Sequence, residues 1–385
     1  MVTPLLLAHS LAVADGWQLG KASDSHAEWA AKGGQMKILV YGAGNIGSLY
    51  AGLLKESGQD VSILATEMRL ADIREHGIQL ENVVTGKKTA VHVRAVDRLD
   101  ADDAYDLVLV VLPKNHVAEV LPILAENRQT PSIMFVGNNA AGPGEMIEVL
   151  GHERVLLGFP GAAAVAGDHS IRYLIVSASE QPTTIGELDG TRSPRVEAIA
   201  NALKAAGFPV SICSNMDAWL KTHVAEISPT ANALYMAGVD AGRLARTRDA
   251  LVLMLRAIRE GYSVLSAHGI PITPKSHRIF QWLPEPLLLV LMRQMVESDT
   301  TSIKIGHALG ARNEMKTIAD ELRGLAGTTS ISTPATDRLY QYLDANAEPV
   351  PAGSSEIPVN WNALWIALGV FAALAACAWP WLNAK

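Results

Sequence analysis

Apolar runs alternate with amphipathic segments through the first half of the chain. Four runs are almost wholly apolar, as in strands that a parallel sheet buries on both faces: residues 36–41, 60–65, 106–112 and 132–136. Helical spacing follows the first two of these runs, at residues 45–57 and 69–76. Strands that alternate with helices predict an α/β domain with a parallel sheet.

The pattern changes from mixed to purely helical near residue 215. Before that point, β-type segments at residues 154–186 predict an antiparallel extension of the sheet, followed by a helix at 194–206 and a strand at 209–213. After it, helices are predicted at residues 217–237, 245–268, 283–297, 316–322 and 337–343. The sequence therefore predicts a domain with a Rossmann-type parallel sheet over residues 36–215 and an all-helical domain over residues 216–345.

The C-terminal segment has the composition of a membrane helix. Residues 357–384 carry no charge, and residues 363–382 are mostly apolar, which is the length that a helix needs to cross a bilayer. Tryptophans stand near both ends of this stretch: Trp361, Trp365, Trp379 and Trp381. We predict a C-terminal transmembrane helix at residues 361–383, after a linker at residues 346–360 that is rich in Pro, Gly and Ser. A buried core helix is the alternative.

Composition and the N-terminus add further limits. The formal net charge of −7 argues against nucleic-acid binding, which needs a basic face. Cys213 and Cys377 are far apart, so we expect neither a disulfide framework nor a metal site, and the cytoplasm is the default compartment for the domains. Residues 1–35 precede the first strand, as an unimportant extension or as the result of an upstream start codon chosen in error.

A glycine-rich motif directly follows the first predicted strand. The sequence GAGNIG, residues 42–47, has the GxGxxG pattern between a strand and a helix. Gly42 permits the tight turn, Gly44 lets the backbone approach a pyrophosphate, and Gly47 allows close packing of helix on strand. Asn45 and Ile46 begin the helix, whose first amide groups point toward the phosphates. These five residues predict a dinucleotide site.

The end of the second predicted strand discriminates between the two nicotinamide cofactors. An acidic residue there binds the ribose 2′-hydroxyl of NAD, and a basic residue binds the 2′-phosphate of NADP. Thr66 and Arg69 are suited to a phosphate, whereas Glu67 between them is suited to a hydroxyl. We expect NADPH, with NADH as the open alternative.

Further motifs follow in order through both halves of the chain. They are VLPK at 111–114, VGNN at 136–139, AWLK at 218–221, Glu260 with AHGI at 267–270, Ser302 with Glu314, and TPAT at 333–336. In order and spacing these motifs resemble the ketopantoate reductase family, the 2-dehydropantoate 2-reductases, over residues 36–343. The resemblance implies reduction of a branched 2-keto acid by NADPH to its 2-hydroxy acid.

The resemblance also implies residue roles. Lys221 matches the catalytic lysine, which protonates the developing alkoxide as a general acid, and Glu314 matches the glutamate that orients the substrate. The other matched positions are Asn138, Ser302 and Ser228 for the substrate, with Asn138 and Lys114 also beside the cofactor. By the residues alone, Lys221 is also explained as a solvated helix lysine and Asn138 as a turn residue.

The chain departs from the family where amides hold the keto acid. Ala225, Ser228 and Asp299 stand where the family carries asparagines, so a different small carbonyl substrate is as readily expected as ketopantoate. We expect Ala225→Asn with Asp299→Asn to improve ketopantoate turnover. His223 is a further polar candidate, although a lone histidine is more often structural. A non-catalytic NADP-binding sensor at a membrane is the rival interpretation, and the oligomeric state stays open, a homodimer included.

Overall fold

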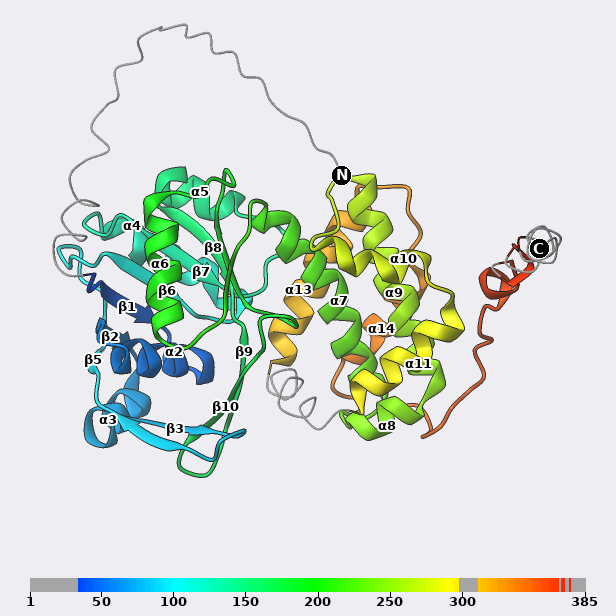
Figure 1. The fold of residues 1–385 in the computed structure, drawn as a ribbon, viewed down its shortest axis with the longest axis horizontal. Helices are drawn as coiled ribbons and strands as arrows, with labels where there is room; N and C mark the ends of the chain where they lie inside the picture. The colour runs from blue at the N-terminus through cyan, green and yellow to red at the C-terminus, as the bar shows by residue number, and fades with distance from the viewer. Residues whose placement is uncertain (1–33, 298–310, 367, 371–373, 375–385) are drawn as a thin grey trace, which may run out of the picture. The chain divides into compact units, whose positions relative to one another are not determined.

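A computed structural model describes residues 34–297, 311–366, 368–370 and 374, and Figure 1 shows its elements. Met36–Lys385 forms one compact unit. The predicted N-terminal extension lies almost wholly outside the described residues.

An eight-stranded sheet is the centre of the first half. Its order is β12-β11-β8-β7-β6-β1-β2-β5, and every neighbouring pair is parallel except β11 and β8. The strands are β1 (Lys37–Tyr41), β2 (Asp60–Leu64), β5 (Arg94–Val96), β6 (Leu107–Val110), β7 (Ile133–Val136), β8 (Val155–Phe159), β11 (Thr183–Glu187) and β12 (Val210–Ile212). The predicted Rossmann-type parallel sheet is therefore confirmed.

A second sheet of four strands was not predicted. It consists of β4 (Lys88–Val91), β3 (Ile78–Asn82), β10 (Ile171–Ile175) and β9 (Ala162–Ala166), in that order. The expectation that all of residues 154–186 extend the main sheet is therefore wrong for β9 and β10, which pair with β3 and β4 instead. The apolar pattern identifies β-type residues, but it does not determine which sheet they join.

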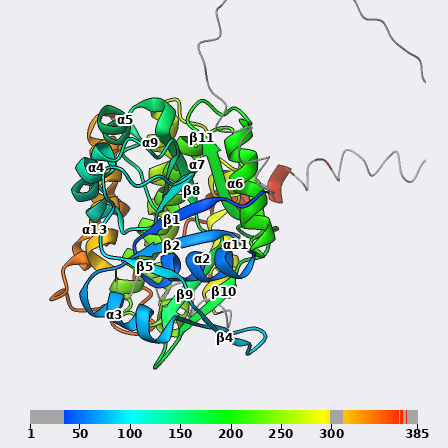
Figure 2. The same cartoon turned by 90° about the vertical axis from the view of Figure 1, so that its left-hand side faces the viewer.

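Helices cover both faces of the large sheet (Figures 1 and 2). The helices α4 (Val117–Glu126) and α5 (Gly144–Leu150) share a core with one face, including Leu39 and Val108. The helix α2 (Asn45–Glu56) packs between the two sheets, and α6 (Pro194–Ala205) packs beside β11 and β12. The helix α3 (Glu67–His76) follows β2. Two covered faces explain why the central strands are apolar at consecutive positions.

Helices are the only regular elements among the described residues of the second half, as predicted. The long helices α7 (Met216–Met236) and α9 (Arg248–Ala267) pack together at its centre. Around them lie α8 (Ala241–Arg246), α10 (Ile279–Trp282), α11 (Glu285–Val296), α13 (Arg312–Gly327) and α14 (Pro334–Tyr340). Two short 3-10 turns lie in this half, η3 (Lys275–Arg278) and η4 (Gln341–Leu343). Two others lie in the first half, η1 (Lys114–His116) and η2 (His152–Arg154).

Residues 349–360, which fall in the predicted linker, are packed along the helical half, and we call them the strap. Buried Asp249 accepts hydrogen bonds from the Ser354 hydroxyl and from the amides of Glu356 and Ile357. Burial by itself raises the pKa of Asp249. The three hydrogen bonds lower it by more, so the net pKa lies below its usual value. The Asn360 amide donates to Glu285 Oε1 at 3.0 Å. Proline and glycine thus indicated irregular backbone correctly, but packing depends on contacts that composition does not report.

The predicted transmembrane helix at residues 361–383 lies largely outside the described residues. Within the part of the chain that the structure describes, no helix combines the length and the apolar character that a bilayer span requires. Residues 362–366 are helical, and the side chains of Trp361, Trp365 and Ile366 are exposed. The membrane anchor therefore stays a prediction.

Candidate active site

The glycine motif forms the turn between β1 and α2. Gly42 has φ +116°, and a Cβ on Gly42 or Gly47 would overlap a backbone carbonyl oxygen, so neither position accepts a side chain. Gly44 differs because its φ is −69° and a Cβ there would meet nothing within 4 Å. No described side chain caps the start of α2 at Asn45 and Ile46. The fold itself does not require a glycine at position 44. A phosphate group bound to the first amides of α2 would require one, because a side chain there would occupy its space.

The tip of β2 brings Arg69 to this turn. Its guanidinium donates to Ser48 Oγ, on the first turn of α2, at 3.2 Å and forms an ion pair with Asp72. Thr66 is exposed at the start of α3, and Glu67 has an unusual positive φ of 44°. Arg69 thus lies beside the glycine turn, with its charge partly balanced by Asp72.

Asn138 and Glu314 meet at the end of β7. Asn138 Nδ2 donates to Glu314 Oε1 at 3.0 Å, and the Lys114 amide approaches the same oxygen at 3.4 Å. Glu314 lies in the first turn of α13 and is 3% exposed. The other amide atom, Asn138 Oδ1, is buried and has no hydrogen-bond partner among the described atoms. The sequence-predicted residues Asn138, Lys114 and Glu314 therefore lie together.

Glu321, which sequence reasoning missed, holds this edge of the sheet to α13. Its Oε1 is 3.3 Å from Lys114 Nζ, and its Oε2 accepts from the amides of Ala140 and Ala141 at 2.8 and 3.0 Å. Glu321 follows Glu314 by seven residues, so both carboxylates lie on one face of the helix. That spacing was the available signal. Lys114 is paired already and mostly buried, so it is a weaker candidate for binding a cofactor phosphate.

Asn138 is near the start of a loop formed by residues 137–142, and Lys221 of α7 lies against the end of that loop at Gly142. Lys221 is 7% exposed, and its Nζ is 2.5 Å from both carboxylate oxygens of Asp217, one helical turn earlier on α7. A Cβ on Gly142 would be 3.1 Å from Lys221 Nζ. Burial excludes the interpretation of Lys221 as a solvated surface lysine. Asp217 is a second residue that the sequence reasoning missed, although its spacing of four from Lys221 was visible.

The remaining predicted substrate residues are placed less directly. Ser228 is buried on α7, seven residues after Lys221 and on the same face of the helix. Ser302 and Asp299 lie outside the described residues. His223 is partly buried, and its ring packs against those of Phe159 and Trp219, with centroid distances of 4.1 and 5.4 Å. Burial lowers the pKa of His223 to about 4, so it is neutral at physiological pH and packs as a structural ring.

Ala225 contradicts the expectation that asparagine there would restore a substrate contact. The side chain is fully buried, and its Cβ would be only 3.0 Å from a Cβ on Gly261 of α9. Ala225 therefore belongs to the contact between the two long helices rather than to a substrate pocket.

We expect Ala225→Asn to destabilise the protein by about 2–4 kcal/mol, because it adds volume and an unpaired amide to a close helix contact. Thermal unfolding of the purified variant measures the loss. Thr230→Asn, at a half-exposed position of the same helix, is the control. A variant that melts like the parent and gains ketopantoate activity would restore the original expectation.

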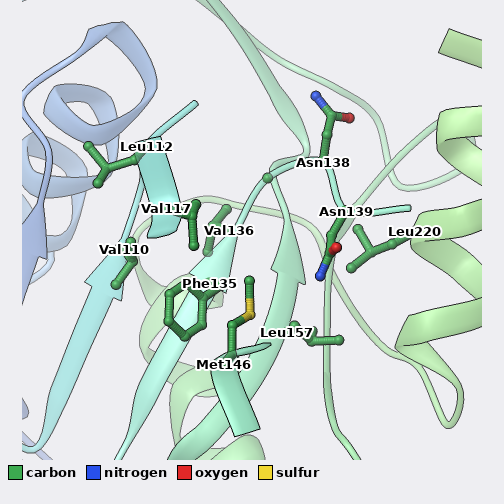
Figure 3. Close-up of a pocket in the computed structure, with 11 residues that line it drawn as sticks. Val110, Leu112, Val117, Phe135, Val136, Asn138, Asn139, Met146, Leu157 and Leu220 are labelled. Carbon is green, nitrogen blue, oxygen red and sulfur yellow. The ribbon is translucent and has the colours of Figure 1, made fainter. Parts of the chain in front are cut away.

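A small cavity lies beside the loop 137–142, and its lining includes Asn138 of this loop and Leu220 of α7 (Figure 3). Its volume is about 10 Å³, which is room for roughly one water molecule. Apolar side chains from β6, β7 and α5 form much of its wall, among them Val110, Phe135 and Met146. It is too small for a nicotinamide or a keto acid, so this cavity is not the substrate site.

Two further motifs are structural. The Glu260 carboxylate accepts from the amides of Ala335 and Thr336 at 2.9 and 2.8 Å and from the Thr336 hydroxyl at 2.8 Å. It thereby satisfies the first amides of α14, where a negative charge is favourable. His268 Nε2 lies 3.0 Å from the Leu325 carbonyl oxygen, at the end of α13.

An open glycine turn on a parallel sheet, with buried Lys221 and Glu314 and half-buried Asn138 beside the same sheet, is typical of an oxidoreductase that binds a dinucleotide. The family model described as ketopantoate reductase PanE/ApbA matches residues 38–190, and the model of its C-terminal part matches residues 217–347. The chain belongs to the ketopantoate reductase family, whose members are NADP-dependent oxidoreductases.

The individual relatives have low sequence identity to this chain, but each match covers nearly the whole length of the relative. A 2-dehydropantoate 2-reductase of Halobacterium salinarum is 24% identical over 302 residues, which is 78% of this chain and 95% of the relative. A solved ketopantoate reductase from Ralstonia eutropha is 19% identical with a TM-score of 0.63, covering 80% of this chain and 97% of the other. D-mandelate dehydrogenase, solved with NADH and anilino(oxo)acetate, is 15% identical with a TM-score of 0.64 and the same coverage. At such identities the solved structures show the fold alone.

Proposed function

We propose that the protein reduces a small 2-keto acid, or a related carbonyl compound, to the hydroxy product with NADPH. Lys221 is the general acid, and Glu314 orients the substrate. The observation that supports this most is the buried Lys221 ammonium, which lies at one end of the loop 137–142, while Asn138 near the other end donates to Glu314.

The residues present fit a dinucleotide. Gly44 leaves open space in front of the first amides of α2, and Asn138 Oδ1 is a buried acceptor that lacks a described partner. A nicotinamide bound here would supply the hydride. Arg69 beside the glycine turn favours a 2′-phosphate, while Glu67 keeps NADH open. D-mandelate dehydrogenase, which shares the fold, was solved with NADH.

The chain's own groups divide the acid and orienting roles. The Lys221 ammonium polarises the carbonyl oxygen and gives it a proton as negative charge develops there. Asp217 holds that ammonium in place from one helical turn away. Glu314 accepts from the substrate hydroxyl, while Asn138 and the Lys114 amide fix its carboxylate.

The charges around the loop limit the choice of substrate. Lys114 and Lys221 already face the carboxylates Glu321 and Asp217, and Glu314 adds a third carboxylate. Ala225 offers no amide to a substrate carboxylate. A strongly anionic substrate is therefore held less firmly than where free cations or amides line the pocket. Ketopantoate stays one candidate, beside other 2-keto acids, ketones and imines.

Steady oxidation of NADPH in a substrate panel tests the proposal. The panel contains ketopantoate, other 2-keto acids, neutral ketones and imines, each assayed with NADPH and with NADH. We expect turnover of at least one compound, faster with NADPH. Tight NADPH binding without turnover of any of them would instead favour the non-catalytic sensor.

We expect Asp217→Asn to lower kcat roughly tenfold with little change in KM, because a charge-assisted bond to Lys221 of about 1.5–3 kcal/mol is lost. Steady-state kinetics on the best panel substrate measure the split. Asp217→Glu keeps the charge and should recover part of the rate. Equal kcat in parent and Asp217→Asn would show that Asp217 is only a structural partner.

We propose that residues 361–383 anchor the enzyme to a membrane, with its domains in the cytoplasm where NADPH is available. Truncation after Asn360 keeps the strap and removes the tail. We expect the full-length chain in a carbonate-resistant pellet and the truncated chain in the soluble fraction, with equal activity and melting temperature. A soluble full-length chain, or a truncated chain that melts lower, would favour a packed tail helix instead.

A further inference from the structure

The helix α11 is apolar on two faces, and among the residues that the structure describes only one of them is covered. Leu288 and Met292 are buried where α11 packs on α8 and α9. Leu287, Val290 and Leu291 share the outer face and are exposed by 43%, 57% and 43%. Trp282 at the end of α10 is 67% exposed. A helix with an apolar outer face needs a partner or a membrane to cover it.

The same region is basic in an acidic protein. Residues 241–297 contain eight lysines and arginines but only four acidic residues, although the whole chain has a net charge of −7. Three of the acids are engaged inside the fold: Asp249 with the strap, Glu260 with α14 and Glu285 with Arg256. The fourth, Glu297, pairs with Arg293. The side chains of Lys275 and Arg278 are exposed just before the exposed Trp282 in the chain, and neither forms an ion pair among the described residues.

We propose that this surface, made by Lys275, Arg278, Trp282, Leu287, Val290 and Leu291, rests on an anionic lipid bilayer. Leucine, valine and tryptophan side chains enter the boundary between headgroups and acyl chains, and the two cations bind lipid phosphates. We call these six residues the α11 surface. The inference goes beyond the proposed reductase activity and does not depend on its substrate or cofactor.

Charge decides against two other occupants. In a symmetric pair of chains the cations of one copy would lie near those of the other, which is unfavourable. The chain's own tail is apolar but has no acidic residue between 357 and 384 to meet Lys275 and Arg278. An anionic bilayer supplies both the apolar layer and the negative charge.

The strap places the predicted membrane tail next to this surface. The amide of Asn360, the last residue of the strap, donates to the carboxylate of Glu285, the first residue of α11. Asn360, which directly precedes the predicted tail, therefore lies at the start of the helix whose outer face is apolar. A tail that inserts in a bilayer would bring α11 to its surface.

A fluorophore on α11 tests the inference in the full-length chain. Val290→Cys, with Cys213→Ser and Cys377→Ser, is labelled with an environment-sensitive dye and mixed with vesicles of phosphatidylcholine, with or without 30% phosphatidylserine. We expect a blue shift that needs phosphatidylserine and weakens with salt. Val84→Cys, at an exposed position between β3 and β4, is the control and should not shift.

In the chain labelled at position 290, Lys275→Glu with Arg278→Glu should remove most of the blue shift on phosphatidylserine vesicles and leave NADPH oxidation unchanged, even where the tail alone holds the chain on the vesicle. Three results would overturn the inference. The dye at 290 stays in water while the chain sediments with vesicles. A shift without vesicles that grows with protein concentration indicates a second copy. A shift without vesicles that is independent of concentration and disappears on truncation after Asn360 indicates the tail.

Discussion

Replacement of Lys221 by alanine should lower kcat by roughly 10²–10⁴-fold, the usual contribution of a positioned proton donor. The residue is buried, and Asp217 holds its ammonium at the loop that also carries Asn138. NADPH affinity should change little, because the glycine turn of the cofactor site lies at a different strand, β1. Stopped-flow reduction and calorimetric titration measure the two properties separately.

Lys316→Ala is the matched control for this prediction. Lys316 also pairs with an aspartate four residues away, Asp320, but both side chains are about half exposed. Its hydrogen bond to Asp320 raises the pKa of Lys316, yet the residue lies on the outer side of α13. We expect the control to turn over like the parent. If both variants keep the parental rate, Lys221 is not the proton donor.

The sequence predicted the elements whose pattern depends on their own environment. Strands covered on both faces have consecutive apolar residues. In β1 every residue after the first is apolar, and in β6 all residues are apolar, so the sequence alone shows this pattern. Strands of the second sheet are partly exposed, and β4 has a single buried residue. Their pairing depends on partners far along the chain, as β3 with β10, so local pattern could not assign them.

The sequence predicted which residues form the candidate site, but it did not predict the side chains with which they pair. Lys221, Asn138 and Glu314 were identified through motif order, and the structure places all three around one loop. Asp217 and Glu321 were missed, because a carboxylate at helical spacing is usually a solvated side chain. Ala225 shows the opposite limit. Its role follows from Gly261 on another helix, which no pattern around Ala225 reports.

Gly44→Val should abolish measurable dinucleotide binding while the fold is kept, and Gly44 is the position where this test is clean. At Gly42 and Gly47 any Cβ would overlap backbone, so loss of binding there could not be distinguished from loss of structure. At Gly44 the backbone is ordinary and the space is open, so a valine meets only the ligand.

The expected loss follows from the geometry of phosphate binding. Oxygens of the pyrophosphate must come within about 3 Å of the first amides of α2, and a branched side chain on Gly44 would fill that space. Calorimetric titration with NADPH, beside thermal unfolding, measures affinity and fold together. Gly324→Val, an exposed glycine of α13 with equally open surroundings, should bind like the parent. Unchanged NADPH affinity in Gly44→Val would place the cofactor elsewhere and remove the basis for the reductase mechanism.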